Sequence, residues 1–461
     1  MSKYRKEIDS LGELFVPKDR YWGAQTQRSI GNFPIGNEKF PPEFIRAMGI
    51  IKQACADINQ DLGLIAPNIS KTIIQASKEV IEGKFNSEFP LVIWQTGSGT
   101  QTNMNVNEVI ANRASEILGA KIGSRKIHPN DHVNRSQSSN DVFPTAMHIS
   151  TVERIHYHLL PSLNHLLMAL KHKQEEFKDI VKTGRTHLQD ATPITFGQVF
   201  SGYITQIEKG ISRINNTLPR LYELAIGGTA VGTGLNSHPD FATKVAQRIN
   251  EITQLPFKAS KNKFEGLAAH DAIVEASSAI KITAISLMKI ANDVRWMGSG
   301  PRTGLGELIL PSNEPGSSIM PGKVNPTQAE ALTQVVVQII GNDTTISIAG
   351  SQGNFELNVF KPVMIYNLLQ SIQLLGDVAV SFANRCIDGL KVNHLKIKHD
   401  LEQNLMLVTA LTPIIGYDKA AEVAHKAYTQ NRTLKEIILE ENLIKEKEID
   451  QILDPRRMTH P

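Results

Sequence analysis

The chain has 461 residues, which is more than one simple hydrophobic core uses, so two or three domains are expected. Hydrophobic residues make up 41% of the chain and charged residues 21%, and no apolar run is long enough to span a bilayer, which excludes a membrane function. The net charge is only +3, and no block of lysine and arginine is interleaved with aromatic residues, so nucleic acid is not expected as a partner.

The two cysteines, Cys55 and Cys386, lie far apart and have no cysteine or histidine neighbour at ligand spacing. They exclude an iron–sulfur cluster or a zinc site built from cysteines alone. We expect both to be buried free thiols in a reducing compartment. The first residues show no apolar signal core, so the sequence predicts a cytoplasmic protein.

Residues 1 to about 40 contain repeated prolines and glycines and are predicted to form an irregular arm. Helical periodicity begins near Pro42. A second helical segment is predicted to end at Gly83, since glycine commonly follows the last turn of a helix.

The segment at 96–108, TGSGTQTNMNVNE, is polar and leads into a further helix. Its glycines Gly97 and Gly99 do not complete a G-x-G-x-x-G motif, and no strand precedes them, so the dinucleotide interpretation is weak.

Residues 125–145 form another polar concentration. The residues after His128, Pro-Asn-Asp, are typical of a turn, and this interpretation is at least as well supported as a ligand role for the histidine. Ser138, Ser139 and Asn140 precede a helix start, where hydroxyl and amide side chains cap the free backbone N–H groups.

Apolar residues recur at spacings of three and four through 149–170, 199–221 and 273–294, which predicts long amphipathic helices with a kink or break at Pro161. Several such helices without alternating β-branched runs indicate a helical bundle. Their apolar content exceeds what one bundle surface needs, so we expect the helices also to pack between subunits.

Two segments lie between these helices. The first, at 184–197, places Thr186 and His187 in a loop before a helix; a lone histidine would more often be structural. The second, at 227–240, is rich in glycine and fits either a flexible lid or a close-packed crossing.

The stretch at 316–326, GSSIMPGKVNP, runs directly into a predicted helix, with Asn325 as its N-cap and Pro326 at its first position. A helix N-terminus favours negative charge, and Lys323 adds a full positive charge, so an anionic ligand is expected. A nucleotide phosphate loop is excluded because Val324 stands where that motif needs serine or threonine and the glycine spacing is wrong.

A further long helix follows this stretch, and a smaller, more charged helical segment closes the chain from about His394. The polar loops share small hydroxyl or amide residues, glycine hinges and a following helix, and together they predict a pocket for a small carboxylate-bearing molecule.

Removal of a proton next to a carboxylate creates an enolate-like dianion, which preorganised donors stabilise. Lys323 and Asn325 fit that role, and Ser317 and His187 are the candidates for the base and the acid. Serine is a poor base unless its alkoxide is strongly stabilised.

The motifs WGAQTQRS, WQTGSGTQTNMN, HPND, SQSSNDVFPTAMH, GRTHLQDATP, GGTAVGTGLN, GSSIMPGKVNPTQAEA and NFELNVF resemble the fumarase/aspartase superfamily over essentially the whole chain. Within it, the sequence is similar to the class II fumarate hydratases, which need no cofactor or metal and interconvert fumarate and L-malate through an aci-carboxylate intermediate.

The resemblance implies a mainly α subunit of three domains, which we place at 1–137, 138–393 and 394–461. It also implies a homotetramer in which long central helices form the shared core and each active site is drawn from three subunits. The expected partners are a small dicarboxylate and further copies of the chain, without nucleic acid or membrane.

The same resemblance assigns residue roles. Ser317 would take the carbon proton, His187 would handle the water, and Glu330 would orient that histidine. The substrate carboxylates would be held by Ser98, Gly99, Thr100, Ser138, Ser139, Asn140, Thr186, Ser318, Lys323 and Asn325. A second, non-catalytic dicarboxylate site would comprise His128, Pro129, Asn130 and Asp131.

Two alternatives remain open. Aspartate ammonia-lyase shares the fold and the proton abstraction, but its members generally have glutamine where His187 stands and alanine where Gly322 stands. A non-catalytic structural member of the superfamily, like a lens crystallin, is the other alternative, against which the presence of Ser317, His187 and Lys323 together argues. The cysteine count separately disfavours the iron–sulfur class of fumarases.

Overall fold

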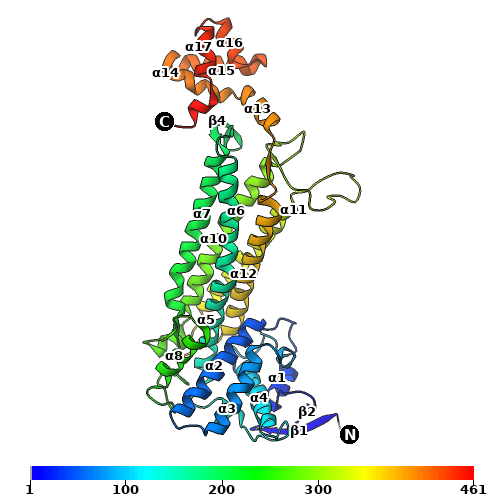
Figure 1. Cartoon of the computed structure of the whole chain (residues 1–461), viewed down its shortest axis with the longest axis vertical. Helices are drawn as coiled ribbons and strands as arrows, with labels where there is room; N and C mark the ends of the chain where they lie inside the picture. The colour runs from blue at the N-terminus through cyan, green and yellow to red at the C-terminus, as the bar shows by residue number, and fades with distance from the viewer. Residues whose placement is uncertain (1–2) are drawn as a thin grey trace. The chain divides into compact units, whose positions relative to one another are not determined.

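The computed structural model describes residues 3–461, and helices dominate it, which confirms the predicted mainly α fold (Figure 1). The chain forms two compact units. The first comprises Met1–Pro161, Ser212–Ile282 and Val337–Gly376, and the second comprises Ser162–Ile211, Thr283–Val336 and Asp377–Pro461. The division into three domains at 137/138 and 393/394 stays a prediction.

The first unit contains seven complete α-helices in the described part of the chain. They are α1 (Ala24–Asn32), α2 (Pro42–Asp61), α3 (Pro67–Ile81), α4 (Thr100–Ile117), α5 (Ser139–Arg154), α8 (Phe241–Thr253) and α9 (Lys263–Ala268). Its short elements are β1 (Tyr4–Asp9), β2 (Gly12–Pro17), η1 (Asn86–Glu88), η2 (Pro129–Val133), η3 (Ile155–Leu159), β5 (Glu223–Leu224) and β6 (Lys258–Ala259).

Besides the helix at 160–176, whose first two residues belong to the first unit, four long helices contribute residues to both units: α7 (Phe196–Leu221), α10 (Asp271–Met297), α11 (Thr327–Gly350) and α12 (Lys361–Phe382). The remaining elements are α6 (Leu160–Glu176), β3 (Val181–Thr186), β4 (Gln189–Thr195), β7 (Leu308–Ile309), η4 (Ala383–Ile387), β8 (Lys391–Val392), α13 (His394–Gln403), η5 (Leu405–Leu411), α14 (Thr412–Ile415), α15 (Tyr417–Gln430), α16 (Leu434–Glu440), α17 (Glu446–Ile452) and η6 (Pro455–Met458).

The prediction of an irregular arm at residues 1 to about 40 is wrong for much of this segment. Strands β1 and β2 form an antiparallel hairpin there, and helix α1 follows. In β1, charged residues face inward and apolar residues face outward. Arg5 and Glu7 face inward, where Arg5 donates to the carbonyls of Arg20 and Trp22, while Ile8 is exposed. Since the inward residues of β1 are charged, a search for alternating buried hydrophobic residues does not find this strand, although Val16 of β2 is fully buried.

The helix predicted from Pro42 is confirmed as α2, which buries Phe44, Met48, Ile51 and Cys55 along one face. The predicted end near Gly83 is also confirmed, since α3 ends at Ile81 and Gly83 has a left-handed φ of 76°. Both cysteines are buried and unpaired.

The helix break that was predicted at Pro161 occurs a few residues before this proline. Helix α5 ends at Arg154, the π-type turn η3 covers Ile155–Leu159, and α6 begins at Leu160. Proline is tolerated at the start of a helix because its missing N–H would have had no partner there. The signature helix α11 starts at Thr327, one residue later than predicted.

The sequence analysis found no apolar run long enough to span a bilayer, and one segment of the structure corrects this statement. Helix α12 together with η4, Lys361–Ile387, is long and apolar enough to cross a membrane by length and composition, and more than half of that window is buried in the structure. Buried core helices of soluble proteins meet the same criterion. Polar side chains such as Asn367, Gln370 and Ser371 interrupt α12, and these fit a packed helix better than a lipid-facing one.

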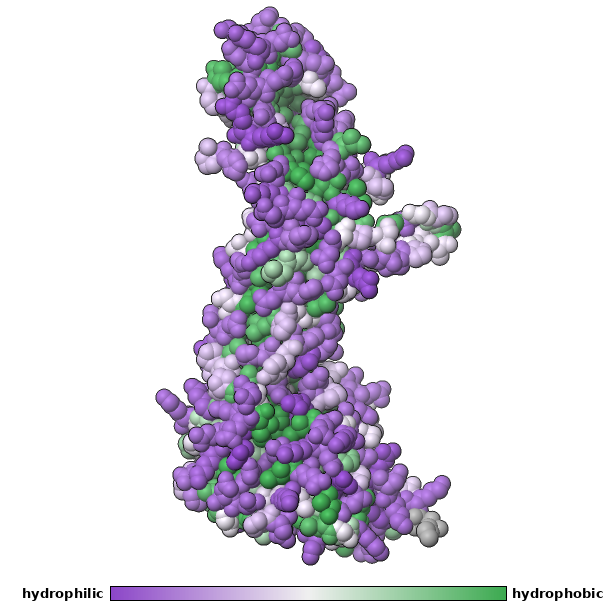
Figure 2. All heavy atoms as spheres, viewed as in Figure 1, coloured by the Kyte–Doolittle hydropathy of each residue, from purple (hydrophilic) through white to green (hydrophobic). Residues whose placement is uncertain are grey.

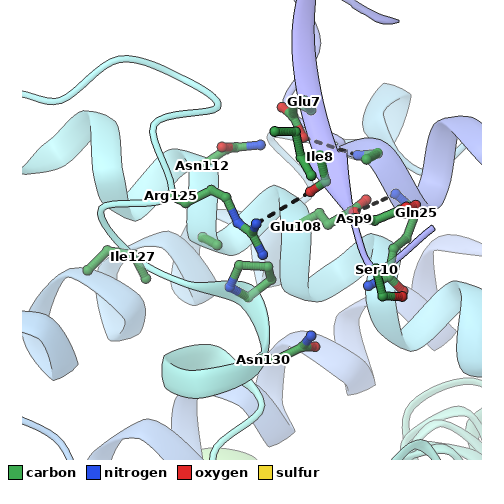
Figure 3. Close-up of a pocket in the computed structure, with 13 residues that line it drawn as sticks. Glu7, Ile8, Asp9, Ser10, Gln25, Glu108, Asn112, Arg125, Ile127 and Asn130 are labelled. Carbon is green, nitrogen blue, oxygen red and sulfur yellow. Dashed lines mark hydrogen bonds between the residues drawn. The ribbon is translucent and has the colours of Figure 1, made fainter. Parts of the chain in front are cut away.

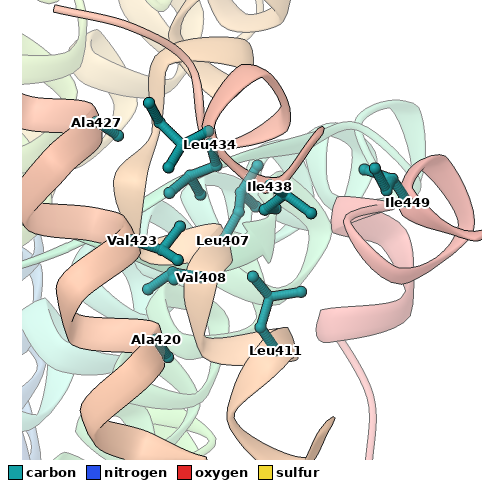
Figure 4. Close-up of a cluster of buried hydrophobic side chains, with 10 residues drawn as sticks. Leu407, Val408, Leu411, Ala420, Val423, Ala427, Leu434, Ile438 and Ile449 are labelled. Atoms are coloured by element: carbon teal, nitrogen blue, oxygen red, sulfur yellow. The ribbon is translucent and has the colours of Figure 1, made fainter. Parts of the chain in front are cut away.

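The chain from η5 onward has a hydrophobic cluster of its own, to which η5, α15, α16 and α17 each contribute (Figure 4). Its buried members are Leu407, Val408, Leu411, Ala420, Val423, Ala427, Leu434, Ile437, Ile438 and Ile449. A terminal helical segment beginning at His394 was predicted, and α13 begins there.

The surface also carries exposed apolar side chains. Figure 2 shows hydrophobic residues among the hydrophilic ones on the face that it presents. On α11, Val337 and Ile348 are 63% and 60% exposed, and Ile340 is also exposed. These three residues lie within one stretch of helix, so α11 presents apolar surface that this single chain does not cover.

Candidate active site

Ser98 and Thr100 lie at the N-terminus of α4, and their hydroxyl oxygens are 2.8 Å apart. Glycine is required on both sides of Ser98, because neighbouring atoms leave no room for a Cβ at Gly97 or Gly99. A Cβ at Gly99 would lie 2.1 Å from the Phe143 ring, and one at Gly97 would lie 1.3 Å from the carbonyl oxygen of Val359. The loop therefore holds two hydroxyls beside the free N–H groups of an 18-residue helix, where anions are favoured.

Ser138 caps α5, as predicted. Its Oγ accepts the N–H of Asn140 at 3.2 Å, and Oδ1 of Asp141 accepts the N–H of Ser138 at 2.9 Å, which completes a capping box. Asn140 donates its side-chain amide to the carbonyl of Ala230 at 2.8 Å. The Ser138–Asn140 group is thus bound to the glycine-rich segment at 227–240.

The contacts of Asp141 distinguish between a flexible lid and a close-packed crossing at the start of the segment at 227–240. Its Oδ2 accepts the N–H of Gly227 at 2.9 Å and of Thr229 at 3.0 Å, and the side chain is fully buried. The start of the segment is therefore close-packed. Burial outweighs these backbone donors and raises the pKa of the Asp141 carboxyl to about 6.

A lysine lies buried beneath the same loops. Lys52 on α2 is fully buried, and its Nζ donates to side-chain oxygens of Asn103, Asn134 and Gln137 at 2.8–2.9 Å. Since all three partners are neutral amides, burial dominates and lowers the pKa of Lys52 to about 7.

The signature loop at 316–326 closes on itself in the second unit. The N–H of Gly316 donates to the carbonyl of Lys323 at 2.9 Å, and the amide of Asn325 donates to the carbonyl of Gly316 at 2.5 Å. The Lys323 ammonium donates to Oδ1 of Asn325 at 2.6 Å. The loop thus brings Ser317, Lys323 and Asn325 together just before α11.

The Ser317 hydroxyl has a distinctive environment. Its Oγ accepts the backbone N–H groups of Ile319 at 3.2 Å and Met320 at 2.9 Å. Two donors aimed at one oxygen stabilise negative charge on it, as in an oxyanion hole. Ser318 follows on the exposed part of the loop, and Glu330 is exposed in the first turn of α11.

The predicted loop at 184–197 is instead an antiparallel hairpin of β3 and β4, so that prediction was wrong in its local structure. His187 and Leu188 form its two-residue tip, and their φ angles of 58° and 61° are both left-handed. Residues with side chains adopt this conformation at a cost of roughly 1–2 kcal/mol each. The hairpin therefore holds Thr186 and His187 at an exposed, strained tip.

A buried acid anchors this hairpin. Glu307 is fully buried and pairs with Arg185 at 2.7 Å and with Lys182 at 3.0 Å, both on β3. Among the described residues, the structure shows no hydrogen bond between His187 and Glu330. Their predicted partnership stays a prediction.

The predicted second-site residues form the start of η2, with His128 as its N-cap and Pro129, Asn130 and Asp131 as its first three residues. Nδ1 of His128 accepts the N–H groups of Asn130 and Asp131 at 3.2 and 3.1 Å, and its Nε2 lies 2.5 Å from Nη2 of Arg125. The pKa of His128 is lowered, first by burial and also by the Arg125 charge.

Pro129 and Asn130 line a cavity of about 340 Å³ in the first unit, shown in Figure 3. Two of the carboxylates on its walls have partners, Glu7 with Arg5 and Asp9 with Arg28. Arg125 also lines the cavity and donates to the carbonyl of Ile8 at 3.4 Å.

The sequence interpretation missed several supporting residues. Lys52 lies four residues after Met48 and three before Cys55, on the buried stripe of α2, and a charged residue at such a position is a signal that was available. Glu307 carried no comparable signal, because its partners are distant in the sequence. In residues 3–461, no group of three or more histidine, cysteine or acidic residues is placed to hold a metal ion.

The fold and these loops define a lyase. The family described as "Lyase" matches residues 12–341, and the family described as "Fumarase C C-terminus" matches residues 407–460. The chain belongs to the class II fumarate hydratase family, since full-length relatives of that name are more than half identical to it.

Among those relatives, the class II fumarate hydratase of Mesorhizobium japonicum is 57% identical over 100% of this chain and 99% of its own length. The mitochondrial fumarate hydratase of Rhizopus oryzae is 59% identical over 99% of this chain and 93% of its own. The crystal structure of class II fumarase from Schistosoma mansoni matches with a TM-score of 0.97 and 46% identity, over 99% of both chains.

Proposed function

We propose that this protein catalyses the reversible, stereospecific hydration of fumarate to L-malate. The family membership supports this reaction, and the observation that carries it is the Ser317 hydroxyl, whose oxygen accepts two backbone N–H groups. These donors, with Lys323 in the same loop, supply the alkoxide stabilisation that a serine base requires.

In the direction from L-malate, the Ser317 alkoxide takes the proton from the carbon next to one carboxylate. The electron pair moves into that carboxylate and forms the aci-carboxylate dianion, which Lys323 and Asn325 stabilise. His187 then gives a proton to the departing hydroxyl, which leaves as water, and Glu330 orients this histidine. Fumarate hydration follows the same steps in reverse.

The substrate carboxylates are held by neutral donors and helix N-termini. Ser98, Gly99 and Thr100 act at the start of α4, and Ser138, Ser139 and Asn140 act at the start of α5. Thr186 and Ser318 complete the set with Lys323 and Asn325. A second site of His128, Pro129, Asn130 and Asp131 binds a dicarboxylate without catalysis, and Arg125 supplies its positive charge.

We further propose that the protein acts as a homotetramer of three-domain subunits. The exposed apolar residues on α11, Val337, Ile340 and Ile348, support a core shared between copies, since a monomer rarely leaves such a surface uncovered. Light scattering tests this: a molar mass of four chains is expected, and a mass of one chain would exclude it.

We also propose a cytoplasmic location. The buried free thiols Cys55 and Cys386 are typical of a reducing compartment. Some relatives carry the printed name "mitochondrial", so the location needs its own measurement. Fractionation of the source cells, followed by detection of the protein, distinguishes the two compartments.

The activity is tested by the ultraviolet absorbance of the conjugated double bond of fumarate. Purified, chelator-treated protein is mixed with L-malate and, separately, with L-aspartate. Absorbance that rises with malate alone supports a hydratase that works without added metal. A rise with aspartate alone would assign the protein to the ammonia-lyases, and no rise with either would contradict the proposal.

A further inference from the structure

A chain of hydrogen bonds in the first unit begins at the buried Lys52 and ends at Ser139. The Lys52 ammonium donates to Oδ1 of Asn103 at 2.8 Å, to Oδ1 of Asn134 at 2.9 Å and to Oε1 of Gln137 at 2.9 Å. The charged form of Lys52, which predominates below its pKa of about 7, has three donors and no acceptor, so each atom that faces it must be an oxygen. Lys52 therefore fixes the orientation of all three amides.

The orientation of Asn103 determines what reaches Ser139. Because its oxygen faces Lys52, its NH2 group points away and donates to Oδ1 of Asn134 at 3.2 Å and, over a longer 3.4 Å, to Oγ of Ser139. The serine oxygen thus receives a hydrogen bond from inside the protein. A hydroxyl has a single proton, and that of Ser139 is then directed toward another acceptor.

We propose that Lys52, acting through Asn103, positions Ser139 as a hydrogen-bond donor to a substrate carboxylate. The inference rests on the proposed function, in which Ser139 binds substrate. If the amide of Asn103 turned over, its oxygen would accept the Ser139 proton. The carboxylate would then meet a hydroxyl oxygen and lose a favourable contact. Lys52 and Asn103 are positioning residues, and neither touches the reacting atoms.

The environment of Lys52 favours this role over a purely structural one. A buried ammonium is costly, and a carboxylate partner would normally offset that cost. The hydrogen-bond partners of Lys52 are instead three neutral amides, and Asn103 is 1% exposed. The ammonium donates to all three amide oxygens, so it aligns the amides in one direction.

The variant Asn103→Asp separates orientation from stability. The new carboxylate still accepts from Lys52, and more strongly, but it has no N–H to offer Ser139. We expect the KM for fumarate to rise roughly tenfold, with kcat within about threefold of the original, since one hydrogen bond to a charged substrate is lost. The thermal midpoint should also fall, because the new carboxylate faces Oδ1 of Asn134 where the amide donated to it at 3.2 Å, so the change in KM is the readout that decides.

Asn105→Asp is the matched control. Asn105 lies on the same helix and is equally buried. It donates to the carbonyl of Glu88 at 3.0 Å and takes no part in the hydrogen bonds that connect Lys52 with Ser139. We expect this variant to lower the thermal midpoint and leave KM unchanged. The Ser139→Ala background adds a second control, because Asn103→Asp should have no further effect on KM when the hydroxyl is absent.

Lys52→Met tests the first residue of the hydrogen-bonded series from Lys52 to Ser139, with Lys173→Met as its control. Lys173 is a buried lysine of the second unit that donates to the carbonyl of Leu390 at 3.0 Å. We expect Lys52→Met alone to raise KM. If Lys52→Met does not fold, Asn103→Asp decides alone.

An active parent protein combined with an unchanged KM in Asn103→Asp would overturn this inference, as would an equal rise in the Ser139→Ala background. A parent protein that does not hydrate fumarate would contradict the proposed function instead. The two failures are therefore distinguishable.

Discussion

The Asp141 carboxylate accepts the backbone N–H of Gly227 at 2.9 Å, across 86 residues of chain. The same side chain accepts the N–H groups of Ser138 and Thr229, so one buried group joins the cap of α5 to the glycine-rich segment. These bonds fix the Ser138–Asn140 group, and the stability of the first unit should depend on them.

Asp141→Asn should lower the free energy of unfolding by about 2–3 kcal/mol, because an amide NH2 would face a backbone donor and leave it unpaired. Urea unfolding followed by circular dichroism measures the loss. Asp57→Asn is the control: Asp57 pairs with Arg248 at 2.8 Å, where both side chains are about a third exposed, and such a pair contributes under about 1 kcal/mol. Equal losses in the two variants would contradict the role of Asp141.

Lys52 predicts a pH dependence of stability. Its pKa falls from 10.5 to about 7 on folding, mainly through burial, so the unfolded chain binds more protons between those values. Stability from this group is present above pH 10.5 and is lost as the pH falls toward 7. The slope should approach ~1.4 kcal/mol per pH unit.

Comparison with Lys52→Met isolates this slope, since the other titrating groups contribute to both proteins. The unfolding free energy of the parent protein, minus that of the variant, should increase as the pH is raised from 7 to 9. Parallel pH curves would show that the pKa of Lys52 is not lowered on folding.

The helical fold was accessible from the sequence because its helices are amphipathic and carry conventional ends, as with Pro42 and Gly83. The first strand of the N-terminal hairpin was missed because its inward residues, Arg5 and Glu7, are charged. The hairpin at 181–195 was missed because its turn residues, His187 and Leu188, are not those that normally adopt left-handed backbone.

The candidate residues themselves were found through their motifs, whereas their supports were not. Asp141 and Glu307 bind groups that are distant in the sequence, and a single sequence does not show which backbone donors or cations will meet a given acid. The two N–H donors to Ser317 depend on the shape of a loop, which composition does not specify.

His128 should be dispensable for turnover if its site is not catalytic. His128→Ala removes the acceptor of the Asn130 and Asp131 N–H groups, and it should weaken binding of a dicarboxylate at the second site. Steady-state kinetics should show kcat within about twofold of the original, since no interaction made in the transition state is lost. A collapse of kcat would show that this histidine belongs to the active site.

Ser317→Ala should lower kcat by roughly three orders of magnitude or more, since it removes the base that takes the carbon proton. Lys323→Ala should lower kcat by a factor of about 10²–10³, because it removes charge stabilisation of the dianion. The matched control is Ser312→Ala, since Ser312 is an exposed serine just upstream of the same loop. Initial rates from fumarate absorbance measure all three variants, and circular dichroism checks that each is folded. Near-normal turnover in Ser317→Ala would remove this serine from the role of base, whatever the result for Lys323→Ala.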